Sequence, residues 1–123
     1  MTSLLVQAIN PQPAIPELVI YKERPPLMQV KPKELARELL TKKDFKCFNM
    51  IMSKESAWKD KKNPTSSAEG VGQLLDSTYE NLGLKRSSSE VAQTVAALAY
   101  IGRKYGSGGP CAAWAKWQKD KWY

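Results

Sequence analysis

Histidine is absent from this 123-residue sequence, which excludes His-based catalytic triads and His-rich metal sites. Its two cysteines are too few for a four-cysteine zinc site. We therefore expect neither a metal nor another cofactor. No segment is long and apolar enough to cross a bilayer, so we also expect no membrane span.

The charge of the chain is strongly unbalanced, with 19 basic and 12 acidic residues and a formal net charge of +7. Such a surface favours an anionic partner. Peptidoglycan with its acidic peptides, nucleic acid and acidic membranes all meet this description. No known nucleic-acid-binding motif is present, so a nucleic-acid partner is the weakest of these. The length fits one small domain with a small core.

Proline is concentrated at the start of the chain. Residues 1–32 hold six of the eight prolines and no glycine, since the first glycine is Gly70. Proline disfavours helix, so we expect an extended arm over 1–32, with a short strand at 18–21. A disordered leader is the alternative. The first 13 residues have no basic region and no convincing cleavage site, so we do not expect a signal peptide.

Residues 33–123 are predicted to form a mainly α domain. A short helix is expected over 33–40, with Leu35, Leu39 and Leu40 facing inward. Asp44 is the expected cap of the next helix, and residues 58–68 are expected to be a loop.

The second half of this domain shows three further helix signals. Ser77 and Glu80 have the spacing of a capping box, and Gly83 would end that helix. A second box at 87–90 precedes the longest helical pattern, which stops at Gly106. Its predicted inward residues are Val91, Thr94, Val95, Leu98, Ile101 and Tyr105. Pro110 suits the first turn of a last helix.

One carboxylate, Glu55, continues an apolar stripe instead of facing water. Phe48, Ile51 and Met52 precede it by seven, four and three residues, which is the spacing of one helix face. Lys54 directly precedes Glu55, and the loop that follows contains Lys59, Lys61 and Lys62. These lysines either attract an anionic substrate or form an ordinary solvated loop. Desolvation raises the pKa of a carboxyl group, so Glu55 suits a general acid. A Glu near a helix end is otherwise an ordinary surface residue.

The words around Glu55 resemble the active-site stretch of lysozyme-like lytic transglycosylases, most nearly the small domains of actinobacteria and phages. The resemblance covers about residues 45–123 and lies in several words that occur in order. They are Glu55-Ser56-Ala57-Trp58, Asn63-Pro64-Thr65-Ser66-Ser67-Ala68, Gly70-Val71-Gly72-Gln73, Leu98-Ala99-Tyr100-Ile101, Tyr105-Gly106, Pro110-Cys111-Ala112-Ala113-Trp114 and Trp122-Tyr123.

This resemblance implies a lysozyme-like fold with a small loop or β element near the active site. It implies cleavage of the β-1,4 bond between N-acetylmuramic acid and N-acetylglucosamine in peptidoglycan, with Glu55 as acid and then base. No second carboxylate is needed, and the product is a 1,6-anhydro sugar. Substrate-binding roles are implied for Ser56, Gly70, Gln73 and Tyr100. In the family, the tyrosine that Tyr100 matches faces the catalytic Glu.

The chain departs from larger family members at two places. Gly72 stands where methionine is common, and Ile101 stands where asparagine often follows the tyrosine. Cys47 and Cys111 match a cysteine pair of the small members, so the resemblance implies a disulfide between them. The alternative is two buried free thiols.

Three readings of the function follow. The first is a lytic transglycosylase, and the second is a hydrolytic lysozyme in which Asp60, Glu69 or Asp76 assists a water. The third is an inactive structural virion component with the same fold. We expect the protein in a virion, or released to the bacterial cell wall at lysis. Residues 1–32 would then dock it on a larger assembly such as a phage particle.

Overall fold

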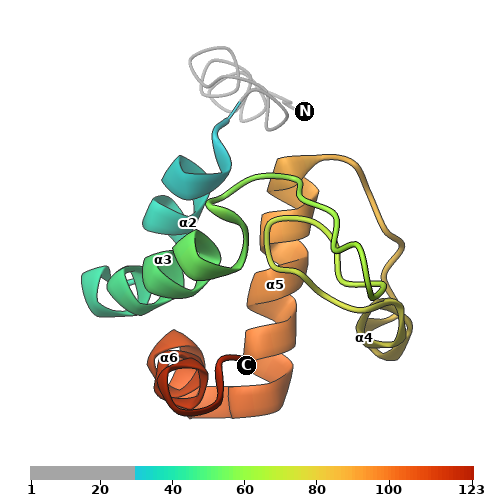
Figure 1. The fold of residues 1–123 in the computed structure, drawn as a ribbon. Coiled ribbons are helices and arrows are strands. Elements are labelled where there is room, and N and C mark those ends of the chain that lie inside the picture. Colours follow the sequence, from blue (N-terminus) through green and yellow to red (C-terminus); the bar gives the residue numbers. More distant parts are fainter. Residues whose placement is uncertain (1–29) are drawn as a thin grey trace, which may run out of the picture.

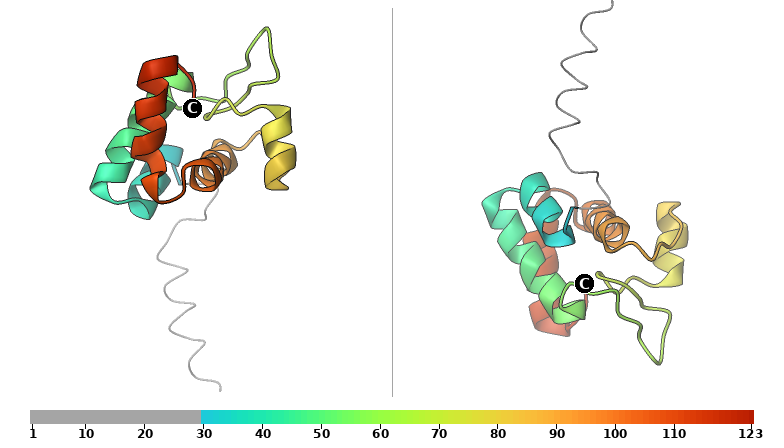
Figure 2. Two further views of the ribbon diagram at one scale, coloured as in Figure 1. Left: turned by 90° about the horizontal axis from the view of Figure 1, so that it is seen from below. Right: turned by 90° about the horizontal axis from the view of Figure 1, so that it is seen from above.

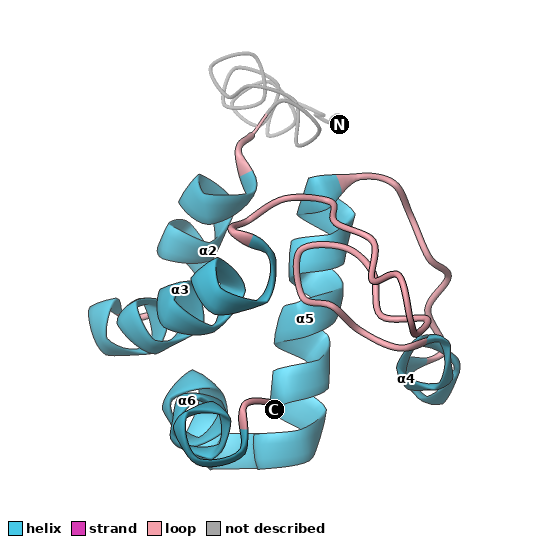
Figure 3. Cartoon of the chain, viewed as in Figure 1, coloured by secondary structure: helices cyan, strands magenta, loops and turns pink. Residues whose placement is uncertain are grey.

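The computed structural model describes residues 30–123, so the predicted strand at 18–21 and nearly all of the predicted arm lie outside the described residues. In this part the chain is mainly helical, as predicted (Figure 3). Its helices are α2 Pro32–Leu39, α3 Lys42–Ser56, α4 Asp76–Leu82, α5 Glu90–Tyr105 and α6 Gly109–Asp120, with a short 3-10 turn, η2 Gly106–Gly108, before α6.

Helix α5 lies between two groups of elements in every view (Figures 1 and 2). On one side α2, α3 and α6 form what we call the helical lobe. On the other side lies the loop lobe, made of residues 57–89 and containing α4. The C-terminal end of the chain lies between the two lobes (Figure 2). This places residues near 123 beside segments that are distant in sequence.

The capping residues differ from the predicted ones. Thr41, not Asp44, caps α3, because the Thr41 hydroxyl accepts a hydrogen bond from the Asp44 amide at 3.1 Å. Asp44 already lies inside the first helical turn, where its charge favours the helix N-terminus. Likewise Ser89, not Ser87, caps α5, by accepting from the amide of Ala92.

The predicted capping box at Ser77 and Glu80 is also wrong. Helix α4 begins at Asp76 after Leu75, which offers no capping side chain. The amide of Asp76 instead donates to the hydroxyl of Ser67, a residue of the preceding loop. The end of α4 is as predicted, since Gly83 adopts a left-handed conformation with φ +70°.

Two predicted inward residues lie on the surface. The side chains of Leu39 and Val95 are 59% and 44% exposed. On α2 only Leu35 and Ala36 are buried, and on α5 the buried face carries small residues, such as Ala96 and Ala97. The buried face of α5 also carries the polar residues Gln93 and Thr94, so it is less apolar than the sequence pattern predicts.

The core lies where α3, α5 and α6 meet. Phe48, Ile51 and Met52 of α3 are completely buried, together with Ile101 of α5 and Ala113 of α6. The stripe that carries Glu55 in the sequence is therefore a core face, as predicted. A disulfide between Cys47 and Cys111 joins α3 to α6.

No strand occurs between residues 30 and 123, but two isolated antiparallel bridges do. They join Lys62 to Glu69 and Glu69 to Leu74, and both lie in the loop lobe. This rudimentary β element directly follows the helix that carries Glu55. In the same described part, none of the helices is long and apolar enough to cross a membrane.

Candidate active site

Glu55 is the penultimate residue of α3, at the point where the chain leaves the helical lobe. The next two residues after the helix, Ala57 and Trp58, adopt left-handed conformations with φ 55° and 62°. The amide of Ala57 donates to the carbonyl of Ser53 and closes the last turn. The chain thus turns sharply toward the loop lobe directly after α3. Glu55 is therefore held in the last turn of a helix, next to this bend.

The Glu55 carboxylate is half-buried and accepts one hydrogen bond, from the indole Nε1 of Trp117 at 2.8 Å. Burial raises the pKa of Glu55 above its ordinary value, while the Trp117 hydrogen bond and the charge of Lys61 lower it. Desolvation is the largest of the three effects, so the pKa remains raised. A carboxyl group in this position keeps its proton to higher pH than a solvated one.

Ser56, the last residue of α3, bonds to a backbone group of the protein. Its side chain is buried, and its hydroxyl donates to the carbonyl of Val71 at 2.6 Å. That hydrogen bond joins the end of α3 to the Gly70–Gln73 turn. The substrate-binding role that the resemblance implies for Ser56 stays a prediction, and the structure shows that its hydroxyl holds the turn against the end of α3.

The turn itself is fixed by Gln93, a buried residue of α5. The Gln93 side chain accepts from the Val71 amide at 3.0 Å and donates to the Ser87 carbonyl at 2.8 Å. Gly70 has φ +90°, and a Cβ there would lie 2.8 Å from the Gln93 side-chain carbon Cδ. Glycine is therefore required at position 70 for both its conformation and its closeness to Gln93.

Gln73 also serves the turn. Its amide nitrogen donates to the carbonyls of Lys61 at 2.7 Å and Gly70 at 2.9 Å. The residue has φ 54°, and it lies in the turn between Glu69 and Leu74, which the second β bridge joins. The substrate-binding role implied for Gln73 stays a prediction, and in the structure its amide nitrogen binds backbone carbonyls.

Gly72, the residue that departs from the common family pattern, packs tightly against α5. A Cβ at this position would lie 2.8 Å from the Cβ of Ala97 and 3.0 Å from the hydroxyl of Tyr123. The Tyr123 hydroxyl donates to the Gly72 carbonyl at 2.6 Å. A larger residue at position 72 would push the turn away from α5. The close packing of the turn on α5 therefore depends on glycine at this position.

Tyr123 is the tyrosine whose electrostatics are tied to Glu55. Burial raises the pKa of the Tyr123 phenol well above its usual range, and the nearby Glu55 carboxylate raises it further. Tyr100 makes its hydrogen bonds elsewhere: its phenol donates to the Tyr123 carbonyl at 2.7 Å and accepts from the Lys104 ammonium at 2.9 Å. Tyr100 thus reaches the Glu55 region through Tyr123.

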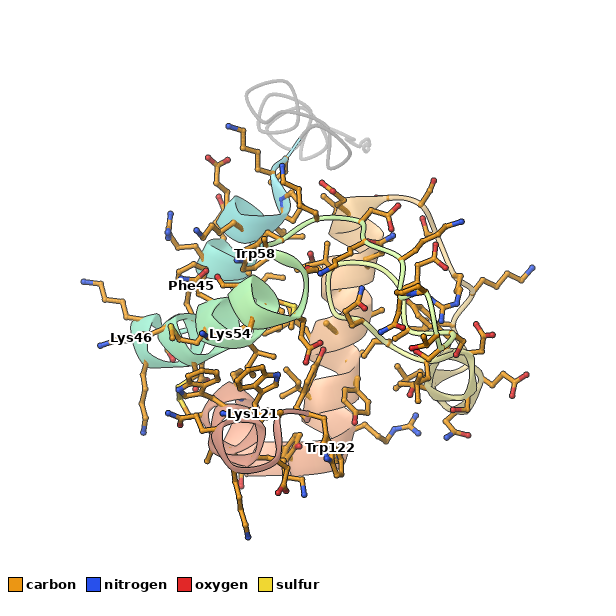
Figure 4. The ribbon with its side chains drawn as sticks, in the orientation of Figure 1. Phe45, Lys46, Lys54, Trp58, Lys121 and Trp122 are labelled. Atoms are coloured by element: carbon orange, nitrogen blue, oxygen red, sulfur yellow. A yellow bond between two sulfur atoms is a disulfide. The ribbon has the colours of Figure 1, made fainter. Side chains whose placement is uncertain are left out.

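Several tryptophans pack near the helix that carries Glu55. Trp58 packs edge-on against Phe48 and donates its indole N–H to the side chain of Asn49 at 2.9 Å. It lies on the α2 side of the molecule, whereas Trp122 lies on the α6 side (Figure 4). Trp117, the partner of Glu55, stacks on Trp114 with ring centroids 5.6 Å apart. Trp58 is therefore a packing anchor of the helical lobe.

Three residues of this site were not predicted from the sequence: Gln93, Trp117 and Tyr123. Gln93 carries the same signal that indicated Glu55, a polar residue on a buried helix face, since Ala97 and Ile101 follow it at four-residue intervals. The hydrogen bond from Trp117 spans 62 residues, and that from Tyr123 spans 51. No local pattern predicts contacts of that separation.

The site thus joins a half-buried carboxyl group with a raised pKa to a tightly fixed glycine-containing turn. Within residues 30–123 there is no group of three or more acidic or cysteine side chains that could hold a metal ion. No protein-family model, no curated protein and no solved structure matches the chain. What the arrangement can do chemically therefore has to be judged from its own residues, and it suits proton transfer by a single carboxyl group.

Proposed function

We propose that the protein is a lysozyme-like lytic transglycosylase that cleaves the β-1,4 bond between N-acetylmuramic acid and N-acetylglucosamine in peptidoglycan. The observation that carries the proposal is the half-buried Glu55 at the end of α3, with its raised pKa and its one hydrogen bond from Trp117. The sequence resemblance supplies the substrate, and the position and burial of Glu55 support its role as the acid.

The proposed reaction uses one carboxyl group twice. Protonated Glu55 donates its proton to the glycosidic oxygen, and the bond from that oxygen to C1 of the muramic acid breaks through an oxocarbenium-like transition state. The Glu55 carboxylate then removes the proton from the 6-hydroxyl of the same sugar, whose oxygen bonds to C1. The proton returns to Glu55 and no water is consumed.

The surroundings of Glu55 fit both halves of this cycle. Burial favours the protonated acid, whereas the Trp117 indole N–H and the charge of Lys61 stabilise the carboxylate that remains after proton donation. Asp76, one of the carboxylates considered as helper of a water, is instead paired with Arg86 at 2.6 Å. This pairing occupies one of the three carboxylates that a hydrolytic mechanism could use.

The test is the nearly isosteric substitution Glu55→Gln, assayed on purified peptidoglycan with the released fragments weighed. We expect a folded protein whose cleavage rate falls by about 100- to 10,000-fold, the usual contribution of a general acid or base. Glu38→Gln, at an exposed position of α2, is the matched control and should cleave normally. Wild-type fragments should carry anhydro ends, which are one water lighter than hydrolytic ends.

Two results would contradict the proposal. Undiminished cleavage by folded Glu55→Gln would show that Glu55 takes no part in the reaction. Fragments with the mass of hydrolysis products would indicate a lysozyme instead.

The proposal extends to how the protein is delivered: we propose that residues 1–32 dock the domain on a phage particle or another large assembly. Removing residues 1–29 should then spare cleavage and abolish incorporation into that assembly.

A further inference from the structure

A hollow of about 350 Å³ lies between α4 and the last turns of α5. This volume falls within the range of small-ligand sites, roughly 300–1,000 Å³. Glu55 is not among the residues that line the hollow, and most of those that do carry polar or basic groups. They are Thr78, Asn81, Leu82, Tyr100, Arg103 and Lys104.

The charge of this hollow is positive and uncompensated. Arg103 and Lys104 are neighbours in the last turn of α5, and no acidic side chain lines the hollow. The ion pairs among residues 30–123 are Arg86 with Asp76 and Lys116 with Asp120, so neither Arg103 nor Lys104 has an acidic partner there. Basic residues also stabilise a helix C-terminus by themselves. The hollow therefore needs further evidence before it can be called a binding site.

That evidence is the way both cations are held. The Arg103 guanidinium donates to the backbone carbonyl of Asn81, across the gap between α5 and α4, at 3.2 Å. The Lys104 ammonium donates to the Tyr100 hydroxyl at 2.9 Å. Interaction with the helix dipole requires neither hydrogen bond. Cations that are fixed before a ligand arrives bind it at a lower entropic cost.

Two hydrogen bonds link the hollow to the candidate active site. Tyr100, which lines the hollow, donates a hydrogen bond to the backbone carbonyl of Tyr123. The Tyr123 hydroxyl in turn donates to the carbonyl of Gly72, in the Gly70–Gln73 turn. The C-terminal end that carries Tyr123 lies between the two lobes in the views of Figure 2. A ligand group in the hollow would thus lie on the same side of α5 as the loop lobe.

We propose that this hollow binds a carboxylate of the peptide that branches from the muramic acid of the glycan strand, an inference that rests on the proposed function. The peptide is the part of peptidoglycan that carries the negative charges, and the sugars next to the scissile bond are otherwise neutral. The Arg103 fork matches a carboxylate in two-point geometry, and Lys104 adds a point charge. The overall charge of +7 then has a local role.

Binding is measured by nuclear magnetic resonance on full-length Glu55→Gln protein, so that no cleavage is needed. The probe is N-acetylmuramoyl-L-alanyl-γ-D-glutamyl-meso-diaminopimelic acid, and the matched probe has its free carboxyl groups converted to amides. We expect the anionic probe to shift the amide signals of Thr78, Asn81 and Arg103, and the amidated probe to bind much more weakly. Adding Arg103→Gln and Lys104→Gln should weaken binding of the anionic probe by roughly ten- to a hundredfold.

The control pair Lys33→Gln and Lys42→Gln removes the same charge from exposed positions of α2 and α3. Equal weakening by this pair would reduce the effect to general attraction and overturn the proposal, as would equal binding of the two probes. If the double variant of the hollow does not fold, the exposed Arg103→Gln alone decides in the same way. Probe binding that depends on Arg103, without any wall cleavage by the wild type, would contradict the proposed function and not the anion site.

Discussion

The helical lobe and the loop lobe, on either side of α5, differ in the interactions that stabilise each of them. In the helical lobe α3 and α6 share a buried apolar core and a covalent link, the Cys47–Cys111 disulfide. The loop lobe adds Val71, Leu74 and Tyr79 to the same core, and the rest of it is tied together by hydrogen bonds of a few side chains. Arg86 alone bonds the Asp76 carboxylate and the Ser67 and Leu74 carbonyls, each at 2.6–2.8 Å, while its guanidinium covers the Tyr79 ring.

This difference separates the two tasks of the proposed site. Glu55 stands on the lobe that is fixed by packing, which keeps the acid in place and desolvated. The Gly70–Gln73 turn belongs to the loop lobe. It buries only Val71 in the core, and hydrogen bonds from Ser56, Gln93 and Tyr123 fix its position. We therefore expect changes in the helical lobe to affect global stability most, and changes at the turn to affect its local placement.

The largest effect should come from removing the disulfide. Replacing both Cys47 and Cys111 by Ala opens a link between residues 64 positions apart, which costs about 4 kcal/mol of unfolding free energy on chain-entropy grounds. Urea unfolding of oxidised wild type and the double variant measures this difference. Reduced wild type should lose stability in the same way. If the double variant is as stable as oxidised wild type, the disulfide adds nothing and apolar packing alone stabilises the helical lobe.

A smaller effect is expected at the junction with the loop lobe, on substituting Gln93→Leu. The change leaves the Val71 amide and the Ser87 carbonyl without their partner, and an unpaired buried group costs about 1–3 kcal/mol. Hydrogen exchange at Val71 should speed up. Thr94→Val is the control, because that hydroxyl bonds to the Glu90 carbonyl inside α5. Equal loss from the two variants would contradict a special role of Gln93 in holding the turn.

These contrasts also explain how much the sequence predicts. The helices of both lobes follow from periodicity and from Gly83, Gly106 and Pro110, which lie where a helix ends or begins. Periodicity also placed Glu55 on the core face of α3. The capping residues were misplaced, because Thr41 and Ser89 lie one to three residues from equally suitable polar side chains. Local signals determine that a helix exists better than where its first turn begins.

The contacts that build the site are of another kind. Ser56, Gly70 and Gln73 were singled out from words in the sequence, yet their hydrogen bonds or close contacts are with protein groups of the turn and its supports. Trp117 and Tyr123 reach Glu55 and Gly72 only after α6 has packed on α3 and the chain end has turned back. Such contacts depend on the tertiary arrangement, which periodicity does not specify.

The smallest effect on stability is expected for Trp117→Phe, which acts on the pKa of Glu55. The phenyl ring fills most of the same space but cannot donate to Glu55, so the carboxylate loses its stabilising hydrogen bond and the already raised pKa should rise further. Carbon-13 titration of the Glu55 carboxyl carbon measures this directly. The protonated form is the active acid, so cleavage should fall at a higher pH than in wild type.

The same change predicts how stability depends on pH. Protonated Glu55 bears no burial penalty, so its contribution is fully present below the ordinary pKa and is lost as pH rises through the raised one. Trp117→Phe should thus differ little from wild type through Glu55 at acid pH, and lose more stability as the carboxylate forms. Trp114→Phe alters the stacked pair without touching the Glu55 hydrogen bond and should leave the titration unchanged. If the pKa of Glu55 does not change in Trp117→Phe, the hydrogen bond from Trp117 has no effect on that pKa. Burial within the helical lobe would then be the cause of the raised pKa.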